Sequence, residues 1–326
     1  MKRMKNKFYQ GDDLTPRLLF LLSARLEETI QTVFPLKEGK WLVITKKHKW
    51  FLKRYSSLSQ LEKQIQLHRF LSNNGFTKVI PFHPISPIKF EKQVFAVMPF
   101  IEPSKKPFRF QTKAEREEAL QLLALFHQKT ENVSEEMASG FHMFDQISVW
   151  RKRLTAFQSL LPELVRYFPP AILEHYTDMG KWCLEHVVEQ PGDEGKMAVI
   201  HGDVAAHNFF RSAAGSLYLI DFDLAARAPA LFDYVQWVNR VLPIVGWDVE
   251  KIMEHRVLSL YARKKNWLIY TMFPADVFRE CRRVMSTSSK EKRIAYQHAY
   301  ELTVKSFTKR KEFFKKWKRE WEKQQG

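Results

Sequence analysis

The chain has 326 residues, of which 45% are hydrophobic and 27% charged, and its formal net charge is +17 at pH 7. These values exclude a disordered chain and are typical of a globular protein long enough for two lobes. The start, residues 1–13, is basic, but the apolar run at 18–22 is too short for a signal peptide, and no run could span a bilayer. Two cysteines, Cys183 and Cys281, indicate reduced thiols in a cytoplasmic protein.

The first hundred residues alternate between helical and strand patterns. Apolar spacing predicts a helix over Pro16 to Gln31. The runs Trp41 to Thr45 and Trp50 to Tyr55, rich in β-branched and aromatic residues, predict a hairpin. A helix is expected over 56–75, where Asn-Gly ends the apolar stripe, and then a strand over Val94 to Pro103.

From "AEREEALQLLALFHQKT" at 114–130 onward the pattern is helical, with one interruption. In that interruption "AVIHGD", "NFFR" and "LYLIDF" predict three short strands, the last two forming a hairpin around "SAAGS". A helix resumes at "ALFDYVQWV". The motif "HGDVAAHN" therefore lies on a loop, and Asp221 follows a hairpin strand.

The C-terminal stretch from Lys305 carries nine Lys/Arg against three Glu. Three of its aromatic residues, Phe313, Trp317 and Trp321, are spaced four apart, which predicts an amphipathic helix. The simpler interpretation is a helix that docks its aromatic face on the protein body and leaves its lysines in water. The second is a basic patch that binds an acidic surface.

The residue types in "HGDVAAHN" and "LIDFD" suit phosphoryl transfer. Such a catalyst must position an acceptor hydroxyl and hold Mg²⁺ against phosphates, and Mg²⁺ prefers carboxylate and amide oxygens. Asp203 could accept the acceptor's proton, and Asn208 and Asp221 could offer oxygens to the metal. Asp and Asn are also ordinary turn residues. The joint pattern of strand, HGD, Asn at the fifth place, hairpin and "LID" favours the site over a chance match.

These motifs resemble the catalytic and metal motifs of the aminoglycoside phosphotransferase and choline kinase superfamily, which has a protein-kinase-like fold. Within it, the chain most resembles the spore-coat-associated kinase-like proteins of endospore-forming bacteria, the coat protein S group. Further support comes from "FLKRY", "LALFHQKT", "SVWRKRL" and the basic aromatic tail. The resemblance implies a two-lobed α+β fold, with a small lobe over residues 1–98 and a helical lobe over 99–326.

The resemblance also assigns roles by position. It implies that Asp203 is the catalytic base, that Asn208 and Asp221 are the Mg²⁺ ligands, and that Lys53 contacts the phosphates of ATP. Glu62, in the following helix, is the expected partner of Lys53. Both residues also have a simpler interpretation as solvent-exposed charges.

Four other residues complete the implied site. Asp233 supports the catalytic loop, and His201 braces that loop by hydrogen bonds. Met98 and Phe100 belong to the hinge against which adenine packs. His207 is either a residue behind the site or an ordinary loop position.

Three hypotheses follow. An active ATP and Mg²⁺-dependent phosphotransferase is favoured by the intact acidic motif. A kinase-like protein with a structural role in the spore coat is favoured by the basic aromatic tail and by the glycine-poor segment before the hairpin, which offers only Gly39. A nucleic-acid-binding protein is suggested by charge alone, without a recognition motif. The basic helices favour an anionic acceptor or an acidic protein partner over an aminoglycoside. The expected localisation is cytoplasmic or in the spore coat.

Overall fold

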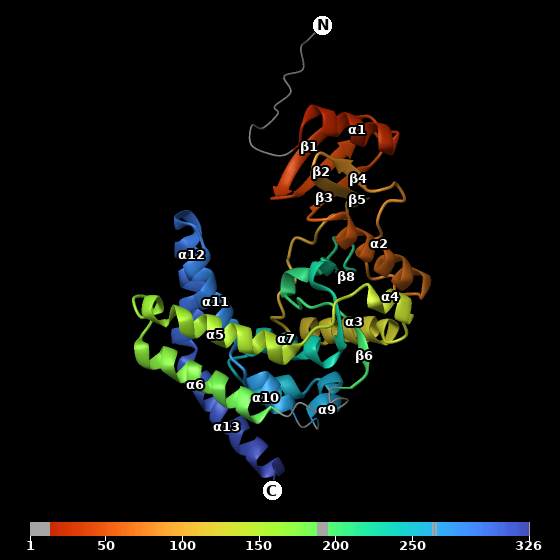
Figure 1. The fold of residues 1–326 in the computed structure, drawn as a ribbon. Helices are drawn as coiled ribbons and strands as arrows, with labels where there is room; N and C mark the ends of the chain where they lie inside the picture. The colour runs from red at the N-terminus through yellow and green to blue at the C-terminus, as the bar shows by residue number, and fades with distance from the viewer. Residues whose placement is uncertain (1–13, 188–194, 263, 265, 326) are drawn as a thin grey trace. The chain divides into compact units, whose positions relative to one another are not determined.

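The computed structural model describes residues 14–187, 195–262, 264 and 266–325. The basic start at 1–13 lies outside the described residues. The chain, coloured by residue number in Figure 1, divides into two compact units. The sheet unit comprises Met1–Pro107 and Phe210–Asp223, and the helical unit comprises Phe108–Phe209 and Leu224–Gly326. The predicted lobe boundary after residue 98 stays a prediction.

The sheet unit is built on five antiparallel strands in the order β1-β2-β3-β5-β4. Its elements are α1 Pro16–Leu26, β1 Ile30–Lys37, β2 Lys40–Thr45, β3 Lys49–Tyr55, α2 Leu58–Asn73, β4 Ile88–Phe90 and β5 Gln93–Pro99. The chain later returns to this unit in a small hairpin of β7 Phe209–Arg211, whose first residue belongs to the helical unit, and β8 Leu217–Leu219. The predicted hairpin of β2 and β3 is confirmed.

The two helices cover opposite faces of this sheet (Figure 1). The buried leucines of α1 pack against Trp41, Leu52 and Val97. On the other face Leu61 of α2 packs against Tyr55 and Ala96. Because side chains alternate along a strand, residue 53 shares the α2 face with residue 55. The sheet therefore directs Lys53 toward α2, away from the α1 core.

The helical unit consists of one short sheet and a set of packed helices. Its sheet pairs β6 Met197–Ile200 with β9 Ala226–Pro229 in antiparallel fashion. Its helices are α3 Lys113–Thr130, α4 Glu135–Ser139, α5 Gln146–Leu164, α6 Pro170–His186, α7 Leu231–Val241, α8 Val249–Met253, α9 Arg256–Ala262, α10 Trp267–Met272, α11 Ala275–Ser286, α12 Ser289–Tyr300 and α13 Phe307–Gln325. Cys183 and Cys281 are buried and free. None of the described helices is long and apolar enough to cross a membrane.

The C-terminal helix α13 docks on the helical unit through its aromatic side chains. Phe313 and Trp317 are buried, and the Trp321 ring lies 5.3 Å from that of Trp182 on α6. Phe313 contacts the Trp247 ring at 5.4 Å. Several lysines of α13 stay exposed. The helix thus has the geometry of the simpler interpretation, an aromatic face against the protein body.

Two predicted boundaries were wrong. The first helix ends at Leu26 instead of Gln31, because Glu27 adopts a left-handed conformation (φ 55°) and the chain turns into β1. The predicted strand over Val94 to Pro103 ends at Pro99. The strands β1, β4 and β9 were not expected from the sequence.

Candidate active site

Lys53 is the centre of a charged cluster in the sheet unit. Its ammonium group donates to Asp221 Oδ1 at 2.8 Å and to both oxygens of Asp223 at 2.9 Å. The side chain is buried, and its nitrogen also lies 4.7 Å from the centre of the Tyr55 ring. A buried lysine is stable only when paired, so the two aspartates keep this cation in place.

Two further side chains complete the lysine–aspartate cluster, which comprises Lys40, Lys53, Gln64, Asp221 and Asp223. Lys40, directly opposite Lys53 in the sheet, donates to Asp221 Oδ2 at 2.9 Å. Gln64 of α2 donates to Asp223 Oδ1 at 2.6 Å. The cluster joins residues more than 150 positions apart in the sequence.

The expected pairing of Lys53 with Glu62 was wrong. Glu62 is exposed on α2, whereas Gln64 is buried and faces the cluster. Two helical positions correspond to about 200° of rotation, so residues 62 and 64 lie on opposite sides of the helix. Asp223, which the sequence did not single out, takes the position of counter-ion together with Asp221.

Asp221 is held in its ionised form. Burial raises the pKa of its carboxyl, but the charge and hydrogen bond of Lys53, followed by those of Lys40, outweigh it and hold the pKa well below its ordinary value. The residue also has a φ of 69°, a left-handed conformation that aspartate tolerates better than most residues. The turn after β8 thus presents an ionised carboxylate beside two ammonium groups.

The loop His201–Asn208, in the helical unit, is organised by Asp233 of α7. The Asp233 carboxylate accepts hydrogen bonds from the backbone N–H of His201 at 2.7 Å and of Gly202 at 3.0 Å. His127 of α3 contacts the same carboxylate through Nε2 at 2.8 Å. Burial raises the pKa of Asp233, but the hydrogen bond and charge of His127 outweigh it, so the pKa lies below its ordinary value.

The start of this loop is tightly constrained. Gly202 has a φ of 79°, and an added Cβ would lie 2.1 Å from the carbonyl oxygen of Leu224. The buried ring of His201 accepts a hydrogen bond from the backbone N–H of Asp203 at 3.3 Å. The His201 ring thus makes a hydrogen bond within the loop, and its role in bracing the loop stays a prediction. The glycine of "HGD" is needed because the chain passes close to Leu224 at this point.

Asp203 is linked to Asn208 and to a residue that the sequence did not indicate. Asn208 Nδ2 donates to the Asp203 carbonyl at 2.8 Å and to its carboxylate at 3.2 Å. Arg240 of α7 donates to Asp203 Oδ1 at 2.5 Å. The Asp203 and Arg240 side chains are 29% and 27% exposed, so a solute can reach both.

The residues proposed as Mg²⁺ ligands have suitable donor atoms. Both amide hydrogens of Asn208 go to Asp203, which leaves its Oδ1 free of hydrogen bonds among the described residues. Asp221 is ionised and offers carboxylate lone pairs. Within the described part of the chain, no group of three His, Cys, Asp or Glu side chains forms a closed metal centre. Mg²⁺ commonly uses one or two carboxylates and retains waters, so each of these side chains offers an oxygen of the kind that this metal takes.

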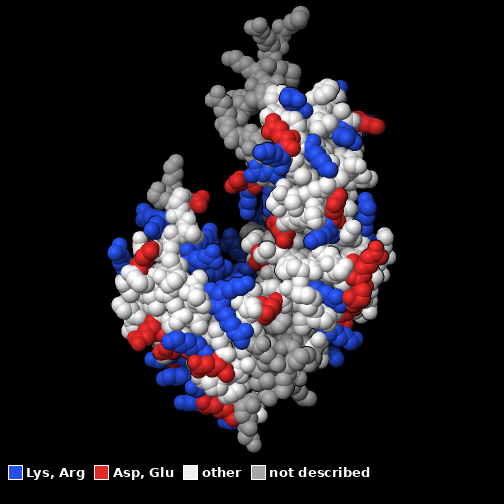
Figure 2. All heavy atoms as spheres, in the orientation of Figure 1, with Lys and Arg blue, Asp and Glu red and all other residues white. Residues whose placement is uncertain are grey.

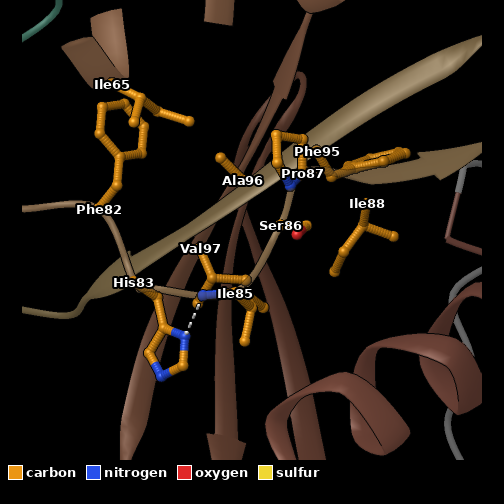
Figure 3. A pocket seen from close by; sticks show the side chains of 10 residues that line it. All are labelled: Ile65, Phe82, His83, Ile85, Ser86, Pro87, Ile88, Phe95, Ala96 and Val97. Carbon is orange, nitrogen blue, oxygen red and sulfur yellow. Dashed lines mark hydrogen bonds between the residues drawn. The ribbon is translucent and has the colours of Figure 1, made fainter. Parts of the chain in front are cut away.

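The predicted hinge residues lie at the end of β5 and just beyond it. Met98 is buried and pairs with Phe51, and the Phe100 backbone N–H donates to the Lys49 carbonyl at 3.0 Å. A small, mostly apolar pocket opens beside β5, between Ile65 of α2 and the segment 82–88 (Figure 3). No charged residue lines it. The assignment of Met98 and Phe100 to adenine stays a prediction.

Comparisons with known proteins place the chain among phosphotransferases. The model of the phosphotransferase enzyme family matches residues 38–250. Comparison with curated protein sequences gives no match. Among solved structures, an aminoglycoside phosphotransferase from Alicyclobacillus acidocaldarius subsp. acidocaldarius is similar at 17% identity and a TM-score of 0.69, covering 98% of this chain and 99% of the other.

Two further solved structures share the fold. A spectinomycin phosphotransferase, solved with ADP and spectinomycin, has 16% identity and a TM-score of 0.64, covering 90% of this chain and 97% of its own. A choline kinase from Streptococcus pneumoniae has 14% identity and a TM-score of 0.54, covering 89% of this chain and 98% of its own. These similarities confirm the predicted two-lobed kinase-like α+β fold.

Proposed function

This chain belongs to the phosphotransferase enzyme family, and we propose that it transfers the γ-phosphoryl group of ATP to a hydroxyl-bearing acceptor with the help of Mg²⁺. The observation that carries the proposal is the ion pair between buried Lys53 and Asp221 at 2.8 Å. A buried cation beside ionised carboxylates can bind both a phosphate and a divalent metal. The solved spectinomycin phosphotransferase, which shares the fold, binds ADP.

The residues have distinct proposed roles. Lys53 contacts the nucleotide phosphates, Asp221 and Asn208 hold Mg²⁺, and Met98 and Phe100 form the hinge for adenine. The metal supplies positive charge that offsets the charge developing on the phosphoryl oxygens. His201 and Asp233 hold the catalytic loop in place. Glu62, exposed on α2, is left out of the proposed site because Gln64 and Asp223 occupy the positions beside Lys53.

Asp203 is the proposed base. The acceptor oxygen forms a bond to the γ-phosphorus, and the bond from that phosphorus to the β,γ-bridging oxygen breaks. The acceptor's hydroxyl proton passes to the Asp203 carboxylate, and ADP carries away the bridging oxygen's charge. Because the transition state is loose, the main task of Asp203 is to orient the hydroxyl. Asn208 and Arg240, which both bond to Asp203, fix the direction of its carboxylate.

An acceptor screen tests this role. Purified protein is incubated with ATP, Mg²⁺ and pools of hydroxylated compounds, and formation of ADP above the acceptor-free rate is measured. The proposal expects one pool to stimulate ADP formation, and Asp203→Asn to lower the stimulated rate at least about 100-fold. Asp178→Asn, which removes an exposed carboxylate of α6, is the matched control. Equal rates for the Asp203→Asn variant and the wild type would exclude Asp203 as the base.

A second candidate is an assembly protein of the spore coat with little or no turnover. The turn between β1 and β2 supports it. Lys37 pairs with Lys40, so only Glu38 and Gly39 form this turn. Gly39 has a φ of 69°, and the Arg54 side chain packs against it. A turn this short brings few backbone N–H groups to a phosphate, in contrast to a glycine-rich kinase loop. Localisation in the cytoplasm or the spore coat stays a prediction.

A further inference from the structure

Arginines on three helices of the helical unit act on one another through their charges, and one of them, Arg240, bonds to Asp203. Arg240 of α7 bonds directly to Asp203. The helices α5 and α11 pack through the rings of Phe157 and Phe278, whose centres lie 4.6 Å apart. Arg153 lies one helical turn before Phe157, and Arg279 directly follows Phe278. Figure 2 shows Lys and Arg side chains gathered over α5 and α11.

The carboxylates near these arginines already have cationic partners. Asp203 bonds to Arg240 at 2.5 Å, and Glu280 bonds to Arg279 Nε at 2.8 Å. Arg310 of α13 binds both oxygens of Asp276 at 2.7 Å. Each of these three carboxylates is therefore already bonded to a guanidinium, and Glu280 also contacts His298 and Arg283.

Arg153 takes no part in these ion pairs. Its side chain is half-buried and has no hydrogen-bond or ion-pair partner among the residues that the structure describes. Burial and the positive charges of Arg279 and Arg240 outweigh the negative charge of Asp276 and hold the pKa of Arg153 below its ordinary value. Burial and the charge of Arg279 lower the pKa of Arg240 in the same way. An unpaired, partly buried cation among like charges costs stability unless a ligand neutralises it.

We propose that Arg153, Arg240 and Arg279 form an anion site beside Asp203, and that the acceptor is a small hydroxylated molecule that carries a phosphate or carboxylate group. The anion site rests on the arginines alone, whereas its use for the acceptor rests on the proposed function. Guanidinium groups bind planar or tetrahedral oxyanions through paired N–H donors, so three of them select a negatively charged group. A cationic acceptor such as an aminoglycoside would be repelled.

The site also connects acceptor binding to the proposed base. The Arg240 guanidinium bonds to Asp203 at 2.5 Å. An anionic group on the acceptor supplies a second counter-ion to Arg240 and weakens its hold on Asp203. The acceptor's hydroxyl then competes for the same carboxylate oxygen. The arginines thus position the acceptor, and Arg240 acts on the reaction through Asp203.

The first test is binding of inorganic phosphate at 150 mM NaCl, measured by titration calorimetry without nucleotide. Four proteins are compared: wild type, Arg153→Gln, Lys152→Gln and Lys53→Gln. Lys152→Gln removes the same charge from the exposed neighbouring position of α5. We expect the wild type to bind phosphate saturably. Arg153→Gln should weaken the affinity at least tenfold, and Lys152→Gln and Lys53→Gln should each change it less than about twofold. Absence of saturable binding, or binding lost in Lys53→Gln and kept in Arg153→Gln, overturns the anion site.

The second test uses stability, because Arg153→Gln removes an unpaired cation. Without phosphate, the melting temperature of Arg153→Gln should rise by a few degrees relative to wild type, and Lys152→Gln should not change it. Added phosphate should raise the melting temperature of wild type and not that of Arg153→Gln. A lower melting temperature for Arg153→Gln without phosphate would assign the arginine a structural role instead. Neither test uses ATP, so the results decide on the anion site independently of phosphoryl transfer.

Discussion

Lys40 and Lys53 stand directly opposite each other in β2 and β3, and their ammonium groups donate to the two oxygens of one carboxylate, Asp221, at 2.9 and 2.8 Å. Like charges at a cross-strand pair repel each other, so this arrangement needs a shared counter-ion. Asp221 supplies it, and Asp223 adds a second negative charge beside Lys53. Two cations and two carboxylates thus lie side by side at this point of the sheet unit.

The two lysines should differ in their effect on stability. Lys53 is 8% exposed, whereas Lys40 is 30% exposed. Lys53→Met leaves two carboxylates side by side with one remaining lysine, and we expect a loss of about 3 kcal/mol in the free energy of unfolding. Lys40→Met, the matched control, should cost less than about 1 kcal/mol. Urea denaturation at pH 7 measures both, and equal losses would contradict the account.

Asp233→Asn should disorder the loop His201–Asn208. The Asp233 carboxylate bonds to the backbone N–H groups of His201 and Gly202 and to His127. An amide has only one acceptor atom, so at least one buried donor loses its partner, and we expect a destabilisation of about 2 to 4 kcal/mol. Chemical denaturation against Asp178→Asn provides the comparison. A change below about 0.5 kcal/mol would show that the loop does not depend on this carboxylate.

Gly202→Ala, which adds one methyl group, should strongly destabilise the folded protein. The new Cβ would lie 2.1 Å from the Leu224 carbonyl oxygen, and the φ of 79° is unfavourable for alanine. Backbone must move, so we expect a loss of about 3 kcal/mol or more. Gly215→Ala tests the conformational part alone, because that glycine has a φ of 85° and open space around it. Thermal unfolding of both variants should separate the two effects, and similar melting points would show that the loop relaxes freely.

Protonation of Glu280 should account for part of the loss of stability at acid pH. Burial raises the pKa of this carboxyl, but bonds from His298 and Arg279 outweigh it, so the pKa falls from 4.5 to about 2. A lowered pKa gives a stabilising term that is complete above about pH 4.5 and is lost as the pH falls toward 2. Glu280→Gln should therefore be less stable at pH 7 by about 2 to 3 kcal/mol, with a flatter acid dependence. Parallel pH profiles of variant and wild type between pH 5 and 3 would rule this contribution out.

Much of the fold could be predicted because its elements have regular patterns. The hairpin of β2 and β3 shows runs of β-branched and aromatic residues, and α2 has a periodic stripe that ends at Asn74. The strand β1 has no such signal. It is an edge strand, mostly exposed, and contains Pro35. The strands β4 and β9 have three and four residues, too short for a period to be visible.

The candidate site could be predicted only where the chemistry is local. Asp203 and Asn208 lie five positions apart and are hydrogen-bonded in the structure. The partner of Lys53 could not be deduced, because Asp221 and Asp223 lie 168 and 170 positions away. Asp223 had one available signal, its place two residues after Asp221 in "LIDFD". Arg240 and Arg153 had none, since each depends on how helices pack.

The most direct test of the central claim is the melting temperature of the wild type and of Asp221→Ala, with ATP and Mg²⁺ added separately and together. A ligand that binds only the folded protein raises its melting temperature. We expect a rise for the wild type that requires both ATP and Mg²⁺ and that Asp221→Ala abolishes. No rise in the wild type at millimolar ATP and Mg²⁺, or an equal rise in the variant, would contradict a nucleotide and metal site built on the lysine–aspartate cluster.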